Sequence, residues 1–275
     1  MKLKDTFLSL IKGGITGISS LIPGISSGSI LVSLGAYTDT VEGIGNIFKK
    51  NNRKIFLVAF PIFLGLLAGL FGGQRLVYYF LDNYKLQTIF LFIGLIAGGY
   101  RLVIRNINSK KKSTIYKNVG LFLLVFVLTI IIQVLVIENI GLKILFVKDS
   151  LVFGLLAGFI LLIPGLSLTT NDVLRSNYGL LYGDLLNIFN LSSFLSIILF
   201  LIGAIISILV VSYIAYKILL RKPKFIMLIT GAMLTASIVI AILQIDKFTP
   251  SFVNIFTTIL AFLWGYILAK NLENE

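Results

Sequence analysis

The chain has 275 residues, of which 57% are apolar, a mean hydropathy of +1.01 and a net charge of +13. A soluble domain of this length could not bury so much apolar surface, so the composition predicts a membrane protein. Cysteine and histidine are both absent, which excludes disulfides, thiolate metal sites, cysteine nucleophiles and histidine acid–base catalysis. The sequence therefore predicts no catalytic residue, no metal site and no cofactor.

The first predicted element, residues 7–45, is an apolar segment that is broken in its middle. Its break reads Leu21-Ile22-Pro23-Gly24-Ile25-Ser26. Proline ends the incoming helix and glycine permits the turn, so a second half-helix is expected to begin at about Ser26. Residues 3–11 have an amphipathic spacing, and they are either an interfacial helix or simply the start of this segment.

Three apolar runs long enough to cross a bilayer follow, at about 55–73, 88–104 and 119–137. Pro61 is expected to kink the first run. Residues 74–87 are interpreted as a connection. The pairs Gly65/Gly69 and Gly94/Gly98 have the spacing of close helix packing.

After a linker at about 138–150, residues 151–187 repeat the broken pattern. When residues 13–37 are aligned with 154–178, nine of the 25 positions are identical. The matches include Pro23 with Pro164, Gly24 with Gly165, and Ser26 with Ser167. Three further runs follow, at 195–216, 225–243 and 252–269. An interrupted apolar segment at corresponding places in two halves indicates the binding site of a transporter.

The loop charges set the topology. Basic clusters lie at 49–54, 105–117 and 217–224, whereas 74–87, 138–150 and 244–251 are mixed or nearly neutral. The positive-inside rule places all three basic loops in the cytoplasm only if each Pro-Gly segment returns to the side it entered. The positive charge is therefore ascribed to topology and to contacts with membrane lipids, and not to nucleic acid.

The predicted fold is an all-α polytopic membrane protein with an inverted-topology repeat. Each half consists of a re-entrant helical hairpin and three transmembrane helices, in residues 1–140 and 150–275. Because three is odd, the second hairpin enters from the opposite face, and the two tips are expected to meet near the midplane. Both termini are expected in the cytoplasm. The oligomeric state is left open, a homodimer included.

The two tips are rich in hydroxyl groups and in helix N–H donors, which are suited to an oxyanion such as phosphate. The alternative is that the hydroxyls only cap the half-helices. Charged residues near the tips are further candidates: Arg75 either meets a headgroup or snorkels, and Asp172 and Arg175 can pair at i, i+3. Asp39 and Glu42 fit a solvated cytoplasmic edge. The candidate phosphate-binding residues are Ser26, Ser27, Gly28, Ser29, Ser167, Thr169, Thr170, Asn171, Arg175 and Arg75, with Pro23, Gly24, Pro164 and Gly165 as helix breaks.

The residues 21–30, Leu-Ile-Pro-Gly-Ile-Ser-Ser-Gly-Ser-Ile, followed by 34–37, Leu-Gly-Ala-Tyr, resemble the polyprenyl-phosphate transporter family (PopT-like). Residues 72–80 and 93–98 are similar to that family's basic residue and glycine-rich span. The resemblance implies a bacterial plasma-membrane translocase that returns undecaprenyl phosphate from the outer to the cytoplasmic leaflet. The second tip departs from the family because Leu168 to Asp172 replace its small residues.

Two other functions remain open at this point. A polyprenyl-pyrophosphate phosphatase (BacA-like) would need a carboxylate or histidine beside the phosphate, and Asp172 is the candidate nearest a tip. A channel or carrier for a small anion would need an aqueous path.

Overall fold

A computed structural model describes residues 3–47, 54–107, 112–134, 150–167, 169, 181, 183–245 and 251–273. Within these residues the secondary structure is helical, without strands. Five described helices are long and apolar enough to cross a membrane: Gln74–Val103, Tyr116–Val134, Leu191–Arg221, Pro223–Leu243 and Phe252–Leu272. The expectation of an all-α, multi-pass membrane protein is confirmed at this level.

The first half begins with the broken segment. Its elements are α1 (Leu3–Ser19), α2 (Ser27–Ser33), α3 (Tyr37–Gly45), the π-helical η1 (Ile55–Ala59) and α4 (Phe60–Gly72). Because α1 runs unbroken from Leu3, the amphipathic N-terminal residues are the start of the first Pro-Gly segment and not a separate helix. The limb after the tip is divided into α2 and α3 by Gly35, whose φ is 69°.

The predicted spans of the first half need one correction. The run 55–73 is helical from Ile55 to Gly72, because η1 continues directly into α4, with Pro61 in the first turn of α4. The expected connection at 74–87 is instead the start of α5 (Gln74–Ile107), which is kinked at Tyr84 (φ −140°, ψ 43°). Val77 is buried in the core there and Leu81, one turn further along, packs against the same core, so their burial outweighs the polar residues between them.

The remaining helices overlap the predicted runs, but the first of them begins at Lys112, inside the stretch 105–117 that was predicted to be a loop. They are α6 (Lys112–Ile131), α8 (Ser150–Leu162), α10 (Leu191–Arg221), α11 (Pro223–Leu243) and α12 (Phe252–Glu273). Pro223 occupies the first position of α11, where its missing N–H costs no hydrogen bond. The linker 138–150 lies almost wholly outside the described residues.

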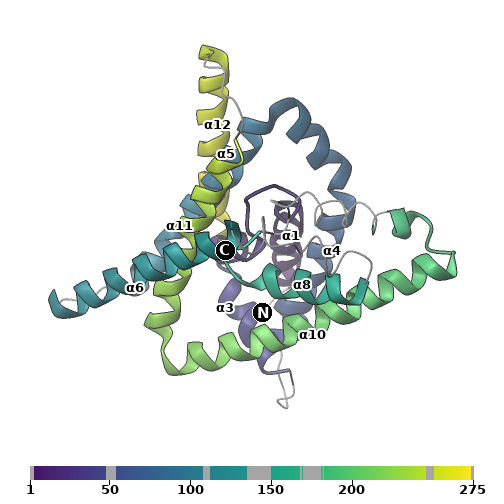
Figure 1. The fold of residues 1–275 in the computed structure, drawn as a ribbon, viewed down its shortest axis with the longest axis horizontal. Helices are drawn as coiled ribbons and strands as arrows, with labels where there is room; N and C mark the ends of the chain where they lie inside the picture. Colours follow the sequence, from purple (N-terminus) through teal and green to yellow (C-terminus); the bar gives the residue numbers. More distant parts are fainter. Residues whose placement is uncertain are drawn as a thin grey trace.

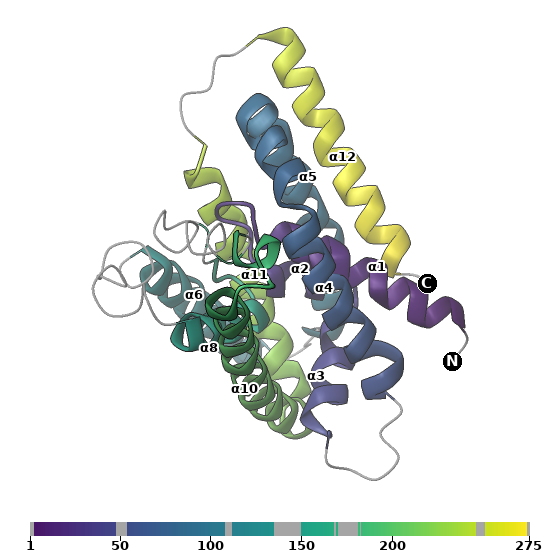
Figure 2. The ribbon, with the colours of Figure 1, turned by 90° about the vertical axis from the view of Figure 1, so that its right-hand side faces the viewer.

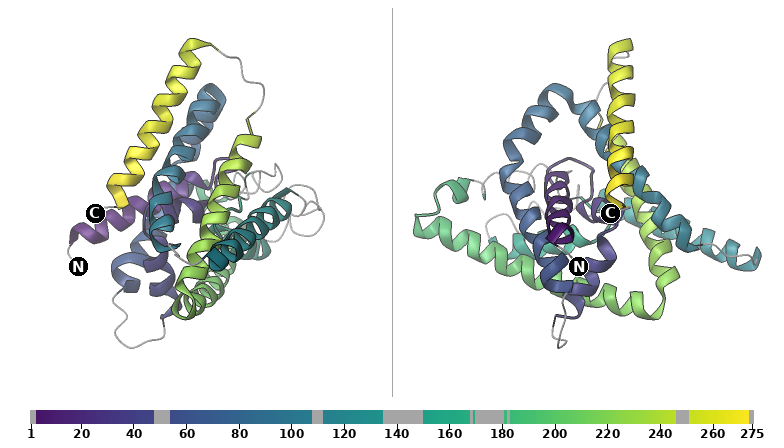
Figure 3. Two further views of the ribbon diagram at one scale, coloured as in Figure 1. Left: turned by 90° about the vertical axis from the view of Figure 1, so that its left-hand side faces the viewer. Right: turned by 180° about the vertical axis from the view of Figure 1, so that it is seen from behind.

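The helices pack in pairs that repeat between the halves. In each half the helix before the tip packs on the next long apolar helix, α1 on α4 and α8 on α10. The last two helices of each half pair across the halves, α5 with α12 and α11 with α6. Figure 1 shows α1 at the centre with these pairs around it, and α12 runs alongside α5 in Figures 2 and 3. The beginning of α1 and the end of α12 lie near each other in all three figures.

Matched glycines make the equivalent contacts in both halves. A Cβ on Gly13 or Gly17 would lie 2.1 Å from the carbonyl oxygen of Ile62 or Leu66 in α4. A Cβ on their counterparts, Gly154 and Gly158, would lie 2.1 and 2.4 Å from backbone oxygens of α10. Backbones this close require glycine. In both halves, therefore, glycines allow the helix before the tip to pack directly on the backbone of its partner helix.

The paired glycines of the long helices also act in packing, as expected. A Cβ on Gly65 or Gly69 would meet backbone oxygens of α1 at 2.1 and 2.2 Å. Gly94 approaches Phe262 of α12 equally closely, and Gly98 lies against Ala269. These glycines are therefore explained by close helix contacts.

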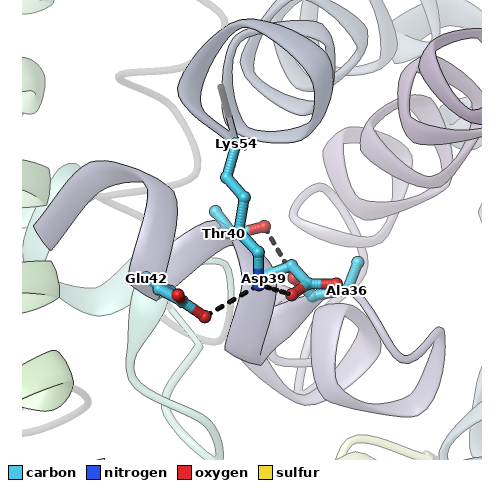
Figure 4. A network of polar contacts seen from close by, with 5 residues as sticks. All are labelled: Ala36, Asp39, Thr40, Glu42 and Lys54. Atoms are coloured by element: carbon cyan, nitrogen blue, oxygen red, sulfur yellow. Dashed lines mark hydrogen bonds and ion pairs between the residues drawn. The ribbon is translucent and has the colours of Figure 1, made fainter. Parts of the chain in front are cut away.

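The end of the first Pro-Gly segment is tied to the next helix by charge. Lys54 Nζ lies 2.8 Å from both Asp39 Oδ1 and Glu42 Oε2 (Figure 4). Partial desolvation lowers the pKa of Lys54, but the hydrogen bonds and charges of Asp39 and Glu42 outweigh it and raise the pKa above its usual value. All three side chains are about half exposed, which agrees with the predicted solvated edge.

The Lys54 network is expected to contribute little stability, and that contribution should not change with pH near neutrality. Because the pKa of Lys54 is raised in the folded protein, the ion pairs stabilise the fold fully at any pH below the pKa of lysine in the unfolded chain, about 10.4. This stabilisation is lost only when the pH rises through the pKa that Lys54 has in the folded protein. Screening limits an exposed pair to about 0–1 kcal/mol. The thermal midpoint of Lys54→Met should therefore lie slightly below that of the unmodified protein, by a constant amount from pH 7 to about pH 9.5. If the difference between the two thermal midpoints disappeared between these pH values, the raised pKa of Lys54 would be wrong.

Candidate functional site

The first tip is a sharp break between α1 and α2. Gly24 has φ 80°, in the left-handed region that favours glycine, directly after Pro23. Ser26 is the N-cap of α2, and its Oγ accepts a hydrogen bond from the N–H of Ser29 at 3.3 Å. The expectation that a half-helix begins at Ser26 is confirmed. Every residue of α2 is buried, so this short helix lies entirely inside the protein.

The second tip has the same backbone geometry. Gly165 has φ 86°, close to the value at Gly24, and follows Pro164 after the end of α8. A Cβ on Gly165 would lie 2.7 Å from the carbonyl oxygen of Met233 in α11 and 2.8 Å from Thr129 in α6. The second tip is thus enclosed by the α6 and α11 pair, and a larger residue would not fit the turn.

The two tips contact each other through reciprocal hydrogen bonds. Ser26 Oγ donates to the carbonyl of Ile163 at 3.2 Å, and Thr169 Oγ1 donates to the carbonyl of Ile22 at 3.0 Å. Ile22 and Ile163 are equivalent residues, each directly before the proline of its own tip. A hydroxyl from each copy therefore pairs with the equivalent carbonyl of the other copy.

Two further contacts close this junction. The N–H of Gly165 donates to Ser29 Oγ at 2.9 Å. A Cβ on Gly28 would lie 2.8 Å from the nitrogen of Pro164. The backbone of one tip is thus packed directly on the backbone of the other, and the hydrogen bonds supply partners for donors that would otherwise be unpaired in an apolar interior.

The hydroxyls of the junction are buried and bonded within the protein. Ser26 and Ser29 are 0% exposed, Ser167 3% and Thr169 1%, and Ser167 Oγ lies 3.2 Å from Thr169 Oγ1. Capping is therefore a real role of Ser26. These hydroxyls can bind a ligand only after the two tips separate. Each hydroxyl then replaces its hydrogen bond to the protein by one to the ligand.

One residue of the junction was missed by the sequence analysis. Gln133 of the α6 segment is 0% exposed, and its amide nitrogen donates to the Ser167 carbonyl while its amide oxygen accepts from the Ser167 N–H, both at 2.9 Å. A lone glutamine in an apolar run is the signal that could have indicated it, because an amide in a membrane span needs partners. Gln133 holds the backbone of the second tip in place.

The other predicted residues are only partly placed. Thr170, Asn171 and Arg175, as well as Asp172, lie outside the described residues. Arg75 is exposed in the first turn of α5, two residues after Gly73, and a Cβ on Gly73 would lie 2.9 Å from the Ile18 side chain of α1. Arg75 is therefore at the same end of α1 as the first tip, although it is not part of the junction. Among the described residues, no cluster of three or more acidic side chains could hold a metal ion.

Taken together, the apolar spanning helices and the enclosed junction define a multi-pass α-helical membrane protein with a polar centre formed by two Pro-Gly tips. Residues 1–119 match the family model VCA0040-like: Undecaprenyl phosphate translocase-like, which confirms the resemblance drawn from the first Pro-Gly motif. The second tip lies beyond this match.

One curated relative is the polyprenyl-phosphate transporter of Staphylococcus aureus (strain NCTC 8325 / PS 47). It is 30% identical over 92 residues, which cover 34% of this chain and 32% of the relative. The match thus spans about a third of the length of that relative. No solved structure matches the chain.

Proposed function

We propose that the protein is a translocase for undecaprenyl phosphate, returning this carrier lipid from the outer to the cytoplasmic leaflet of the bacterial plasma membrane for cell-wall synthesis. The reciprocal pairing of Ser26 with Ile163 and of Thr169 with Ile22 is the observation that carries the proposal. It places two equivalent, hydroxyl-rich breaks against each other inside an apolar protein. The match of residues 1–119 to a translocase-like family supports the same lipid class.

In the proposed mechanism the tips hold the phosphate after they separate. The hydroxyls of Ser26, Ser29 and Ser167 would exchange their protein partners for phosphate oxygens. The first turn of α2 would add N–H groups that have no partner within the helix. An anion buried without such donors would be strongly disfavoured, so the number of convergent donors decides whether the headgroup can enter. Arg75 or Arg175 would neutralise part of its charge.

Movement of one repeat against the other would turn the opened junction from one leaflet to the other. The equivalent helix pairs α1 with α4 and α8 with α10 are rigid units suited to such a movement, because glycine contacts hold each pair closely together. The inverted arrangement of the two Pro-Gly segments and the cytoplasmic position of both termini belong to this proposal and rest on the distribution of basic loops.

Flipping of a fluorescent polyprenyl phosphate by the reconstituted protein tests the proposed site. The double variant Ser26→Ala with Ser167→Ala removes two hydroxyls. Hydrogen bonds to a charged group contribute about 1.5–3 kcal/mol each, so we expect transport to fall at least about tenfold. Arg175→Ala is expected to reduce transport as well. Ser9→Ala is the matched control, because within the described part of the chain the Ser9 hydroxyl bonds to nothing but the Asp5 carbonyl of its own helix.

Unchanged flipping by a well-folded double variant would show that the hydroxyls do not hold the headgroup. The same preparations distinguish the competing functions. Release of inorganic phosphate from polyprenyl pyrophosphate would indicate a phosphatase, and conductance of small anions across a planar bilayer would indicate a channel. We expect neither activity.

A further inference from the structure

An apolar groove lies beside the first tip. Its volume is about 510 Å³, and it is lined by residues of α1, α5 and α12, among them Ile18, Leu76, Phe80, Phe92 and Ala261, and by Ile22 of the first tip. Figure 2 shows α5 and α12 running side by side with α1 beneath them. Tyr84, at which α5 is kinked, is itself a lining residue of this groove.

The groove is open to the outside of the protein along α5. Leu76 is 56% exposed, Phe80 41% and Tyr84 49%. The polar residues of the lining, Gln87 and Thr88, are bonded within the protein: the amide of Gln87 donates to Thr257 Oγ1 at 3.0 Å and the hydroxyl of Thr88 donates to the Tyr84 carbonyl at 2.8 Å. The groove thus presents an aliphatic and aromatic surface to its occupant.

The groove adjoins the junction of the two tips. Ile22 belongs to both, because it is one of the residues that line the groove and its carbonyl accepts the hydrogen bond from Thr169. Leu76 and Val77, which directly follow Arg75, line the same groove. A molecule with an anionic end at the tips would therefore meet apolar walls immediately beyond it.

We propose that this groove holds the first isoprene units of a polyprenyl phosphate, an inference that rests on the proposed function. In this lipid the hydrocarbon chain is joined directly to the phosphate. A glycerophospholipid instead has a glycerol and two ester groups between phosphate and chains, and these polar groups would need partners. Ile18, Ile22 and Leu76 offer none. The lining next to the tip therefore selects the lipid whose chain begins at the phosphate.

A chain-length series tests this inference on the purified protein in lipid nanodiscs. Dimethylallyl, geranyl, farnesyl and undecaprenyl phosphate compete against a fluorescent polyprenyl phosphate. We expect affinity to rise over the first units and then to level off once the groove is filled. Ala261→Trp narrows the groove. In this variant affinity should increase less with chain length, and undecaprenyl phosphate should bind roughly tenfold more weakly. Ile259→Trp is the matched control, because Ile259 is exposed on α12 and does not line the groove.

Photocrosslinking of the unmodified protein gives a readout that does not depend on the folding of a variant. A diazirine on the first isoprene unit should label peptides of α1, α5 and α12 that line the groove, and undecaprenyl phosphate should suppress the labelling while phosphatidic acid does not. Labelling elsewhere, equal competition by phosphatidic acid, or the same length dependence in Ala261→Trp as in the unmodified protein would overturn the groove assignment. If no prenyl phosphate binds at all, the proposed function itself fails.

Discussion

Replacing Gly28 by alanine is expected to lower the thermal unfolding midpoint by several degrees and to reduce lipid transport. The new methyl group would lie 2.8 Å from the nitrogen of Pro164 and 2.9 Å from the carbonyl carbon of Ile163, both backbone atoms that cannot rotate away. Overpacking of this kind costs about 1–3 kcal/mol, and about 2–4 °C of midpoint is lost per kcal/mol in a protein of roughly this size. Thermal unfolding in detergent and flipping of labelled lipid measure the two effects.

Gly120→Ala is the control for this experiment, because a Cβ on Gly120 of α6 would meet no atom within 4 Å. Its midpoint should be unchanged or slightly higher, since alanine favours a helix interior. If Gly28→Ala were as stable and as active as Gly120→Ala, the direct contact of the two tips would be wrong.

Replacing Gln133 by methionine is expected to have the second large effect. Methionine has a similar size but provides neither the donor to the Ser167 carbonyl nor the acceptor for its N–H. A buried backbone group that loses its partner costs about 1–3 kcal/mol, so the second tip should become less stable and less well positioned. We expect a lower thermal midpoint, faster hydrogen exchange around Ser167 and weaker binding of polyprenyl phosphate.

Thr129→Val is the matched control for Gln133→Met. Thr129 lies one turn earlier on the same helix, and among the described residues its hydroxyl bonds to the Val125 carbonyl alone, at 2.8 Å, so valine keeps the shape against Gly165. Hydrogen exchange around Ser167 should be the same in this variant as in the unmodified protein. Equal effects of the two substitutions would indicate a general packing role of α6 and no specific support of the tip.

The sequence predicts the central feature of this fold because that feature is local. A Pro-Gly break has the same backbone requirement wherever it occurs, and the positive φ angles of Gly24 and Gly165 follow from it. The duplication of Gly13 and Gly17 also follows from a contact that only glycine permits.

The parts that could not be predicted depend on distant residues. Gln133 is 34 positions from Ser167, and nothing local to either residue indicates their pairing. The start of α5 looks like a connection by hydropathy, but Val77 and Leu81 pack on the core there and stabilise a helix. The hydroxyls of the tips were expected to be available for an anion, whereas in the structure they bond across the junction.

The most direct test of the proposed function is a cryo-EM structure of the protein in nanodiscs with bound polyprenyl phosphate. The proposal predicts a phosphate between the two tips, about 2.5–3.0 Å from the hydroxyl oxygens of Ser26 and Ser167, with the hydrogen bond between Gly165 and Ser29 broken. A headgroup bound elsewhere, with that hydrogen bond intact, would contradict it.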